Sequence, residues 1–400
     1  MLLAGKELAV SIGTNASPAA QPQTPKRPIP RAMPPVQIGD LQEVIAYTYP
    51  FDGVHDVDQE YYRASLIAAL GRHRIRLTEK TGSLFPSAVR RLQRIRNSYR
   101  LSRTATGRSL ARWAHGAARA LTKGPLFYPG HPVGQYVFRY RRFDLKVVLD
   151  SNDPGDITRP GLLDECDVYF KTNYRKDIDY PSKVFPLPNA NPLVLRNLKL
   201  ARSLRSSPQD CDLFGFFRVW GGKDEIEGIE HNVALFELLT SVKCRKHLEA
   251  YLVCGDVHGI SRRLERIGVA CRTEPMPLHQ LWKMGARSRL HLVRHGMHDC
   301  IPWRMMDVMA SGGCPVLDHP TSTTWPHPLL ERNNYLHLNA PDARRVNRSE
   351  VAETVENWLR DPSLTEGIRS NNITYFEEFL KPLSLGNHIC SVVTSVGEVG

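Results

Sequence analysis

The segment 294–316 combines acidic, basic and glycine residues with the apolar periodicity of a strand, a loop, a helix and a second strand. Its acidic residues Asp299 and Asp307 stand eight positions apart, and the apolar spacing predicts a helix over 303–310. In an open α/β sheet, ligands bind beyond the carboxyl ends of the strands. The loop that precedes this helix is therefore the first place to look for a ligand site.

A second candidate site follows the strand predicted over 212–220, where Arg218, Gly222 and Lys223 come close together. Glycines let backbone amides approach a phosphate, and the two cations add positive charge. A glycine after a strand also serves simply as a turn, so both interpretations remain open here.

Five side chains that can bind metal ions crowd into the segment 291–300: His291, His295, His298, Asp299 and Cys300. Zinc is bound by residues of these types. Their spacing matches no standard zinc motif, however, and a histidine or aspartate in this loop suits a sugar diphosphate better. We therefore expect no metal ligand in the chain.

The segment 290–317 resembles the donor-site region of GT-B glycosyltransferases of group 1. Their pattern is an acidic residue, seven residues, a second acidic residue near a helix start, and then a small residue before Gly-x-Pro-Val. Aspartate stands at both acidic positions here, where glutamate is usual. The Trp-Arg-x-x-acidic portion from Trp303, followed by Gly-Cys-Pro-Val, also resembles exostosin-like members of the same fold class.

The resemblance implies an α/β protein with two Rossmann-like domains facing a cleft, the GT-B arrangement, and a hexosyltransferase-type activity with a nucleotide-sugar donor. Asp307 is then the expected sugar or ribose contact, Asp299 the matching first acidic position and Arg304 a diphosphate ligand. Positive side chains and a helix N-terminus can stabilise the leaving diphosphate, so no metal or other cofactor is required. The donor-binding residues expected in full are Arg218, Gly222, Lys223, Arg294, His295, Asp299, Arg304, Asp307, Gly312 and Gly313.

The N-terminal half is expected to take the acceptor, which is a saccharide or a lipid-linked saccharide. An inverting enzyme needs a base near neutral pKa to deprotonate the acceptor hydroxyl. His55, with Asp52 beside it, follows the first predicted strand, and Asp150 ends another over 143–150. These three are the catalytic candidates, although turn-forming aspartates and surface histidines are common and a retaining enzyme needs no such base.

The chain has 400 residues, which exceeds what one hydrophobic core usually supports. We predict a disordered proline-rich tail over 1–38 and an N-terminal Rossmann-like domain over 39–205 with a basic helical insertion at 80–142. A nucleotide-sugar-binding domain follows over 208–375, and 376–400 is expected to cross back to the first domain. The polar stretch 202–209 reads as the linker.

Strands separated by helical stretches favour a parallel sheet in both halves. In the second half the rhythm is regular, with strands expected at 212–220, 250–255, 269–272, 290–294 and 314–318. Helices are expected between them and at 349–360 and 364–381.

Positive charge is concentrated in the window 80–142, which holds 14 Lys and Arg and no Asp or Glu, against a formal charge of +12 for the whole chain. Apolar residues at helical spacing within it suit either a solvated basic face or a helix on an anionic membrane surface. No nucleic-acid motif accompanies the charge, so nucleic acid is not an expected partner. With scattered cysteines and no secretion signal, we expect a cytoplasmic protein that docks at the inner membrane face.

A different class of function stays open from the sequence. A transferase-like module could recognise a nucleotide or glycan without catalysis and dock to an anionic surface through the basic window. Aspartate in place of glutamate at both acidic positions of the donor-site pattern leaves this alternative open. Turnover separates it from an enzyme, because a binding module shows ligand affinity alone.

Overall fold

The computed structural model describes residues 38–48, 55–81, 106, 109–110, 113–114, 133–157, 160–219, 226–253, 255–256, 259–296 and 298–399. The predicted proline-rich tail and most of the basic window fall outside the described residues. The described residues belong to one compact unit, Met33–Gly400. None of the described helices has the length and apolar character needed to span a membrane.

The first sheet has six strands in the order β2-β1-β3-β4-β5-β6. The strands are β1 (Leu41–Thr48), β2 (Arg76–Thr81), β3 (Val133–Tyr140), β4 (Asp144–Asp150), β5 (Val168–Lys171) and β6 (Val184–Pro186). β3 runs antiparallel to both β1 and β4, whereas the other pairs are parallel. The carboxyl ends of β1, β4 and β5 therefore meet at one edge, where ligands bind in such sheets.

β3 corrects two expectations for this half. The sheet is mixed rather than parallel, and the insertion at 80–142 is not helical at its end, since β3 is a central strand. All of its residues are buried except Arg139, which is half-buried. Its β-branched and aromatic residues favour a strand. A tight hairpin joins β3 to β4, and the rings of Tyr140 and Phe143 stack across it with centroids 4.7 Å apart.

Helices cover and extend this sheet. They are α1 (His55–Arg72), α4 (Pro160–Glu165), α5 (Pro192–Arg196) and α6 (Leu198–Ser203), followed by a 3₁₀ turn (Leu204–Ser206). The stretch 202–209, predicted as the linker, is helical as far as Ser206 and leads to the first strand of the second sheet. The apolar side chains of α6, Leu198 and Leu200 among them, pack on the core and hold this segment in place.

The second sheet is fully parallel, with the order β12-β11-β10-β7-β8-β9. Its strands are β7 (Cys211–Val219), β8 (Lys246–Leu252), β9 (Ala270–Arg272), β10 (Ser288–Leu292), β11 (Pro315–Leu317) and β12 (Leu336–His337). From β7 the chain adds β8 and β9 on one side, and from β10 it adds β11 and β12 on the other. The topological switch point therefore lies between β7 and β10. The predicted α/β class with a Rossmann-like second half is confirmed.

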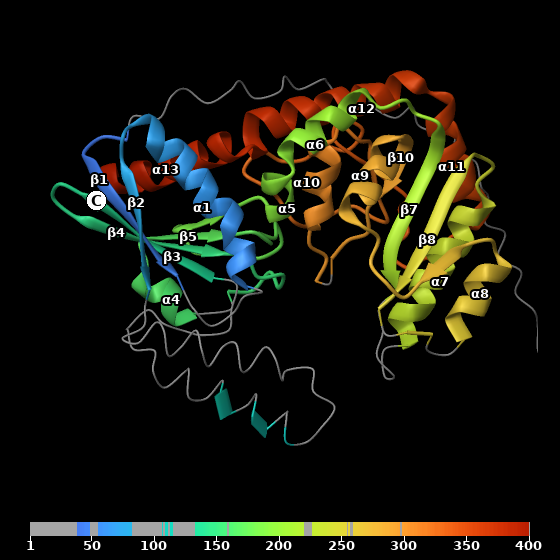
Figure 1. Cartoon of the computed structure of the whole chain (residues 1–400), viewed down its shortest axis with the longest axis horizontal. Coiled ribbons are helices and arrows are strands. Elements are labelled where there is room, and N and C mark those ends of the chain that lie inside the picture. The colour runs from blue at the N-terminus through green and yellow to red at the C-terminus, as the bar shows by residue number, and fades with distance from the viewer. Residues whose placement is uncertain are drawn as a thin grey trace, which may run out of the picture. The chain divides into compact units, whose positions relative to one another are not determined.

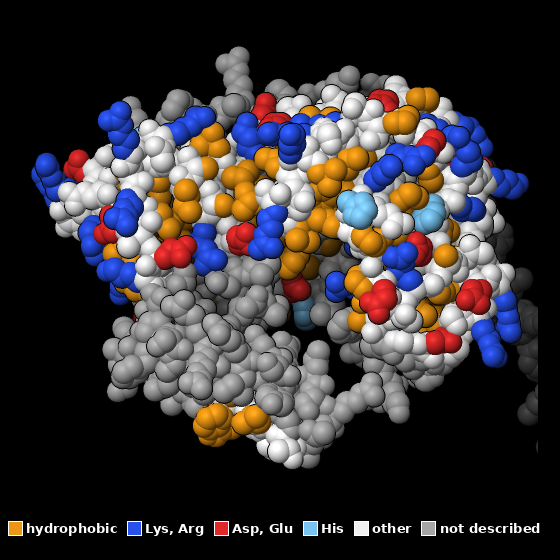
Figure 2. All heavy atoms as spheres, viewed as in Figure 1, with side chains coloured by type: hydrophobic (Ala, Val, Ile, Leu, Met, Phe, Trp, Pro, Cys, Tyr) orange, Lys and Arg blue, Asp and Glu red, His pale blue; other side chains and the backbone are white. Residues whose placement is uncertain are grey.

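Helices flank this sheet as expected from the alternating pattern (Figure 1). They are α7 (Ile226–Ser241), α8 (Ile260–Arg266), α9 (Leu278–Ala286), α10 (Trp303–Ala310), α11 (Arg348–Arg360) and α12 (Pro362–Tyr375), which runs through a π-helical turn (Phe376–Leu380) into α13 (Pro382–Val399). On the face shown in Figure 2, the Lys and Arg side chains are spread out among Asp and Glu.

α13 lies against the N-terminal sheet, and Figure 1 shows it beside α1. The Tyr61 hydroxyl on α1 donates to the Leu380 carbonyl oxygen at 2.8 Å, and the hydroxyls of Tyr140 and Thr394 lie 3.3 Å apart. One hydrophobic cluster contains residues of both sheets, including Val44 of β1 and Phe214 of β7. Each half also encloses a hydrophobic cluster of its own, so the halves share one part of the core and keep another part separate.

Gly386 is the closest point of this contact, and its replacement by alanine is expected to destabilise the protein by about 1–3 kcal/mol through overpacking. A Cβ atom there would stand 1.9 Å from the Ser65 backbone oxygen, so a helix must move. Gly71→Ala on α1 is the matched control, because nothing lies within 4 Å of its Cβ position. Denaturant unfolding of both variants measures the effect. Equal stabilities for the two variants would contradict the close approach.

Candidate functional site

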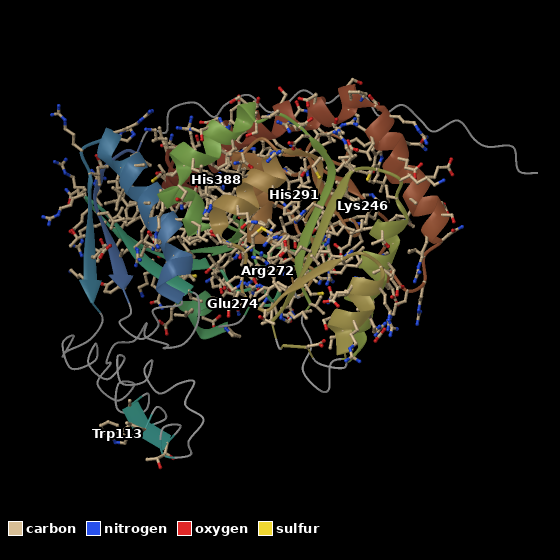
Figure 3. All side chains as sticks on the ribbon, turned by 45° about the vertical axis from the view of Figure 1, so that its right-hand side comes forward. Trp113, Lys246, Arg272, Glu274, His291 and His388 are labelled. Carbon is tan, nitrogen blue, oxygen red and sulfur yellow. The ribbon has the colours of Figure 1, made fainter. Side chains whose placement is uncertain are left out.

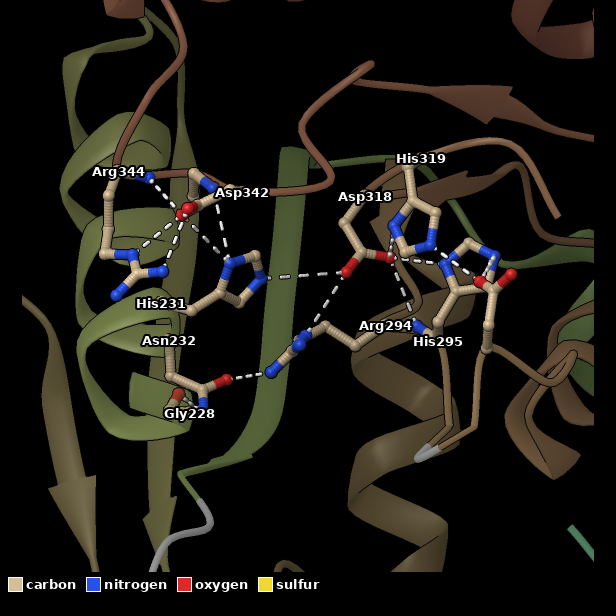
Figure 4. Close-up of polar contacts among 11 residues, drawn as sticks. Gly228, His231, Asn232, Arg294, His295, Asp318, His319, Asp342 and Arg344 are labelled. Atoms are coloured by element: carbon tan, nitrogen blue, oxygen red, sulfur yellow. Dashed lines mark hydrogen bonds and ion pairs between the residues drawn. The ribbon is translucent and has the colours of Figure 1, made fainter. Parts of the chain in front are cut away.

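The carboxyl ends of β7, β10 and β11 gather the charged residues of the second sheet. Arg218 is exposed at the end of β7, next to the switch point. Arg294 and His295 follow β10, and Asp318 and His319 follow β11. Because all these strands are parallel, their ends share one edge of the sheet (Figure 4).

Asp318 organises this edge. Its Oδ1 accepts hydrogen bonds from the backbone N–H of His295 at 3.2 Å and from Nδ1 of the same ring at 2.6 Å. Its Oδ2 lies 3.4 Å from Nε of Arg294. Burial alone would raise the pKa of Asp318, but hydrogen bonds from His295 and His319 and the charge of Arg294 hold it well below its usual range. The carboxylate therefore stays ionised and fixes both neighbours.

A second carboxylate, Asp299, faces the same pair of histidines. Its Oδ1 lies 2.7 Å from Nε2 of His319, and its Oδ2 accepts a hydrogen bond from the Ser322 hydroxyl at 2.8 Å. The rings of His295 and His319 stack with centroids 3.9 Å apart. Hydrogen bonding to Asp318 is the main cause that raises the pKa of His319, against the opposing effect of burial. Two carboxylates thus enclose a stacked imidazole pair.

Polar contacts continue from this pair to α7. Arg294 donates to Oδ1 of Asn232, and its guanidinium lies over the Phe217 ring, 6.0 Å from the centroid. His231 lies 3.9 Å from Asp318 and 3.9 Å from Asp342. Burial lowers the pKa of His231, so this ring tends to stay neutral between the two carboxylates. The result is a continuous network along the strand ends (Figure 4).

The predicted donor residues Asp307 and Arg304 point to the protein interior instead. Asp307 is buried, and its Oδ1 accepts a hydrogen bond from Nδ2 of Asn191, the N-cap residue of α5, at 2.5 Å. Burial raises the pKa of Asp307 to about 7. Arg304 donates to the Phe216 carbonyl oxygen at 2.6 Å, and burial lowers its pKa. Their donor contacts stay predictions.

A small pocket beneath α10 is lined by Asp307 together with Trp282, Arg304 and His291. Figure 3 labels His291 on β10, inside the fold. Burial lowers the pKa of His291 to about 3, helped by the charge of Arg304. A buried acid, Asp307, and a buried base, His291, therefore line the same pocket.

The glycine turn after α10 forms as predicted. Gly312 has a φ of 70°, and the Gly313 N–H donates to the Val308 carbonyl oxygen at 2.7 Å, which closes the helix end. A Cβ at Gly313 would meet the Val308 side chain at 2.6 Å. The glycines are needed for this turn, while their donor-binding role stays a prediction.

The acceptor-side candidates lie at the edge of the first sheet. Asp150 is fully buried, with its Oδ2 3.3 Å from Nζ of Lys171 and accepting from the Tyr169 hydroxyl at 2.6 Å. Burial lowers the pKa of Lys171 despite this pairing. In this arrangement Asp150 positions Lys171 and has no exposed oxygen for an acceptor hydroxyl.

Three further predicted residues, Asp52, Gly222 and Lys223, lie outside the described residues. His55 begins α1, and nothing of its side chain is described. The roles assigned to these four residues stay predictions.

The edges of the two sheets meet through loop contacts. Nδ2 of Asn173, which follows β5, donates to the His298 carbonyl oxygen at 3.3 Å. The Lys176 N–H donates to the Ser322 carbonyl oxygen at 3.1 Å, and the Thr324 N–H donates to the Tyr174 carbonyl oxygen at 2.8 Å. The histidine pair and the end of β5 therefore border the same region.

Sequence reasoning missed Asp318 and His319, although it predicted the strand that ends at them. A polar pair directly after a buried strand was the available signal. It also missed Asn191, which no local pattern connects to Asp307. These residues become functional candidates only when separate strand and helix ends are brought together.

Comparisons with known proteins were made for the whole chain. No protein-family model and no curated protein matches it. Among solved structures, Anabaena Alr3699/HepE in complex with UDP and glucose is 12% identical, with a TM-score of 0.46 over 88% of this chain and 100% of that one. An E. coli trehalose-6-phosphate structure bound with UDP-2-fluoro glucose is 12% identical, with a TM-score of 0.40 over 61% and 64%.

The C-terminal domain of the group 1 glycosyl transferase LpcC from Francisella tularensis is 11% identical, with a TM-score of 0.32 over 46% of this chain and 93% of that domain. At these identities and TM-scores the likenesses establish no activity. Function must therefore be argued from the residues of this chain.

Proposed function

We propose that the protein is a glycosyltransferase that moves a hexose from a nucleotide-sugar donor to a saccharide or lipid-linked acceptor. The observation that carries the proposal is the network at the switch point of the second sheet, where Asp318 fixes Arg294 and His295 beside the exposed Arg218. Sheets of this topology bind nucleotides at that point. The edge of the first sheet borders it and supplies the acceptor side.

Arg218 and Arg294 are the proposed ligands of the donor diphosphate. Arg218 ends β7, Arg294 follows β10, and the two strands are neighbours in the sheet. An arginine held by a buried carboxylate keeps its remaining N–H groups directed, and charge-assisted bonds to phosphate are about twice as strong as neutral ones. The same cations offset the charge that develops on the leaving diphosphate, so this step itself needs no metal.

The first experiment measures thermal stabilisation by nucleoside diphosphates and their sugars, followed by transfer or hydrolysis of whichever sugar binds. Ligand bound only to the folded state raises the melting temperature with occupancy. Binding with turnover supports the transferase. Binding without turnover supports the alternative of a non-catalytic module, and no binding at all contradicts both.

Replacing Arg294 by methionine is expected to lower kcat/KM for sugar transfer by about 100-fold or more, since a preorganised donor to developing charge is worth about 3–4 kcal/mol. Arg262→Met is the control, because Arg262 is exposed on α8, away from the switch point. Initial rates at several donor concentrations measure the effect. An unchanged kcat/KM in Arg294→Met would remove Arg294 from the donor site.

The acceptor is proposed to be anionic or lipid-linked on the basis of the charge of the basic window, 80–142, which adds +14 to an otherwise nearly neutral chain. Clusters of Lys and Arg attract anionic membrane surfaces by roughly 1 kcal/mol per residue near the surface. The protein is expected to sediment with phosphatidylserine vesicles. It is expected to stay in solution with neutral vesicles. Equal sedimentation with both kinds of vesicle would contradict the proposed membrane docking.

A further inference from the structure

Two imidazole nitrogens and one carboxylate oxygen converge where β10 and β11 end. The Nδ1 atoms of His295 and His319 lie 2.6 Å and 3.6 Å from the same atom, Oδ1 of Asp318. One ligand atom from each of these three residues lies within 4.8 Å of the other two. Imidazole with carboxylate is a donor set that divalent transition-metal ions use in proteins.

His319 lies between two carboxylates, and its contact with one of them is loose. Its Nε2 lies 2.7 Å from Oδ1 of Asp299, whereas its Nδ1 lies 3.6 Å from Oδ1 of Asp318, beyond good hydrogen-bond distance. Both carboxylates favour a positive charge at this position, which a protonated imidazole or a bound cation supplies. A metal ion beside Oδ1 of Asp318 would take the place of protons on the two Nδ1 atoms.

The surroundings also have the form of a metal site. Asp299 holds His319 through Nε2, as the outer carboxylate of a carboxylate–histidine–metal arrangement does. Asp299 and His298 both adopt left-handed backbone angles, with φ of 57° and 68°. Such strain costs about 1–3 kcal/mol per residue and persists where the surroundings fix it, typically at functional sites. The loop is thus held in a costly shape that directs Asp299 at His319.

We propose that His295, Asp318 and His319 bind a divalent metal ion of the zinc class, with Asp299 as the residue that orients His319. Binding displaces the protons carried by the Nδ1 atoms of His295 and His319, which leave to solvent. Three protein ligands leave a further coordination position for water or an anionic oxygen. The ligands come from two strand ends, which explains why the spacing within 291–300 shows no zinc motif.

The proposal is independent of the transferase activity, because metal binding is measured without turnover. The purified full chain is stripped with a chelator and titrated with Zn²⁺ by calorimetry and with Co²⁺ by visible absorption. We expect saturable binding of one ion at this site. His319→Ala is expected to weaken that binding by at least about 10-fold, and Asp318→Asn by a similar factor.

His298→Asn is the matched control. His298 is exposed in the same loop, and asparagine tolerates its left-handed backbone, so the affinity is expected to stay unchanged. Metal bound by the cysteines is common to all variants and cancels in the comparison. If His319→Ala fails to fold, His319→Gln takes its place. Absence of saturable binding in the parent chain, or equal binding by parent and His319 variants, would overturn the proposal.

Discussion

The Asp307→Asn variant is expected to gain about 4 kcal/mol of stability relative to the parent protein as the pH rises from about 4 to about 8. Burial raises the pKa of Asp307 from 3.8 to about 7, so the folded protein keeps a proton that the unfolded chain releases. The contribution of Asp307 to stability is therefore complete below the unfolded pKa and is lost as the pH rises through 7. Asparagine keeps the shape of the side chain and does not titrate.

Chemical denaturation of both proteins across this pH range measures the difference in the free energy of unfolding. Taking the difference cancels the titration of all groups that the two proteins share. A difference that stays constant with pH would show that Asp307 is already ionised in the folded state. It would also show that the hydrogen bond from Asn191 to Asp307 joins a charged rather than a neutral carboxyl group.

The His291→Gln variant is expected to show the opposite dependence, gaining up to about 5 kcal/mol relative to the parent as the pH falls from about 7 to about 3. Burial lowers the pKa of His291 from 6.5 to about 3, so the folded protein excludes a proton that the unfolded chain binds. The contribution of His291 is complete above the unfolded pKa and is lost as the pH falls toward 3.

The two groups line the same pocket, and their pH dependences oppose each other where the windows overlap, between about pH 4 and pH 6.5. Over that range the pair contributes little slope to the stability of the parent protein. Each single variant shows the pH dependence of stability that comes from the remaining group. The double variant Asp307→Asn/His291→Gln is expected to show neither dependence. If the double variant keeps either slope of unfolding free energy against pH, that slope comes from other residues.

Much of the second half could be predicted because its elements are local and strongly periodic. The helices over 278–286 and 303–310 have the predicted bounds. The first has buried and exposed residues at helical spacing, and the second is buried over its last six residues. β8 begins at Lys246 rather than at 250, because its first residues include the polar His247 and Glu249. β12 has two residues and leaves no periodicity to detect.

The structure of the first half was harder to predict from the sequence because its central strand lies within a segment rich in basic residues. β3 lies at the end of the basic window, which was predicted as a helical insertion because apolar residues recur at helical spacing earlier in that window. Gly134 allows a close approach that the sequence does not show, because a Cβ atom there would lie 2.2 Å from the Gln59 side chain. Strand order and direction depend on such contacts between residues distant in sequence.

The candidate site divides in the same way. Arg218, Arg294 and His295 could be found from their positions beside predicted strand ends. The burial of Asp307 could not, since it depends on Asn191, 116 residues away. Nor could the role of Asp318, which acts through residues that follow a different strand.

The return of α13 to α1 makes the order of synthesis matter. Tyr61 meets its partner Leu380 only after 319 further residues have been made, which takes roughly 15–60 s at ordinary elongation rates. During that interval the face of α1 that α13 covers has no partner from the C-terminal segment. A circular permutation that places the α13 segment before α1 would shorten the interval.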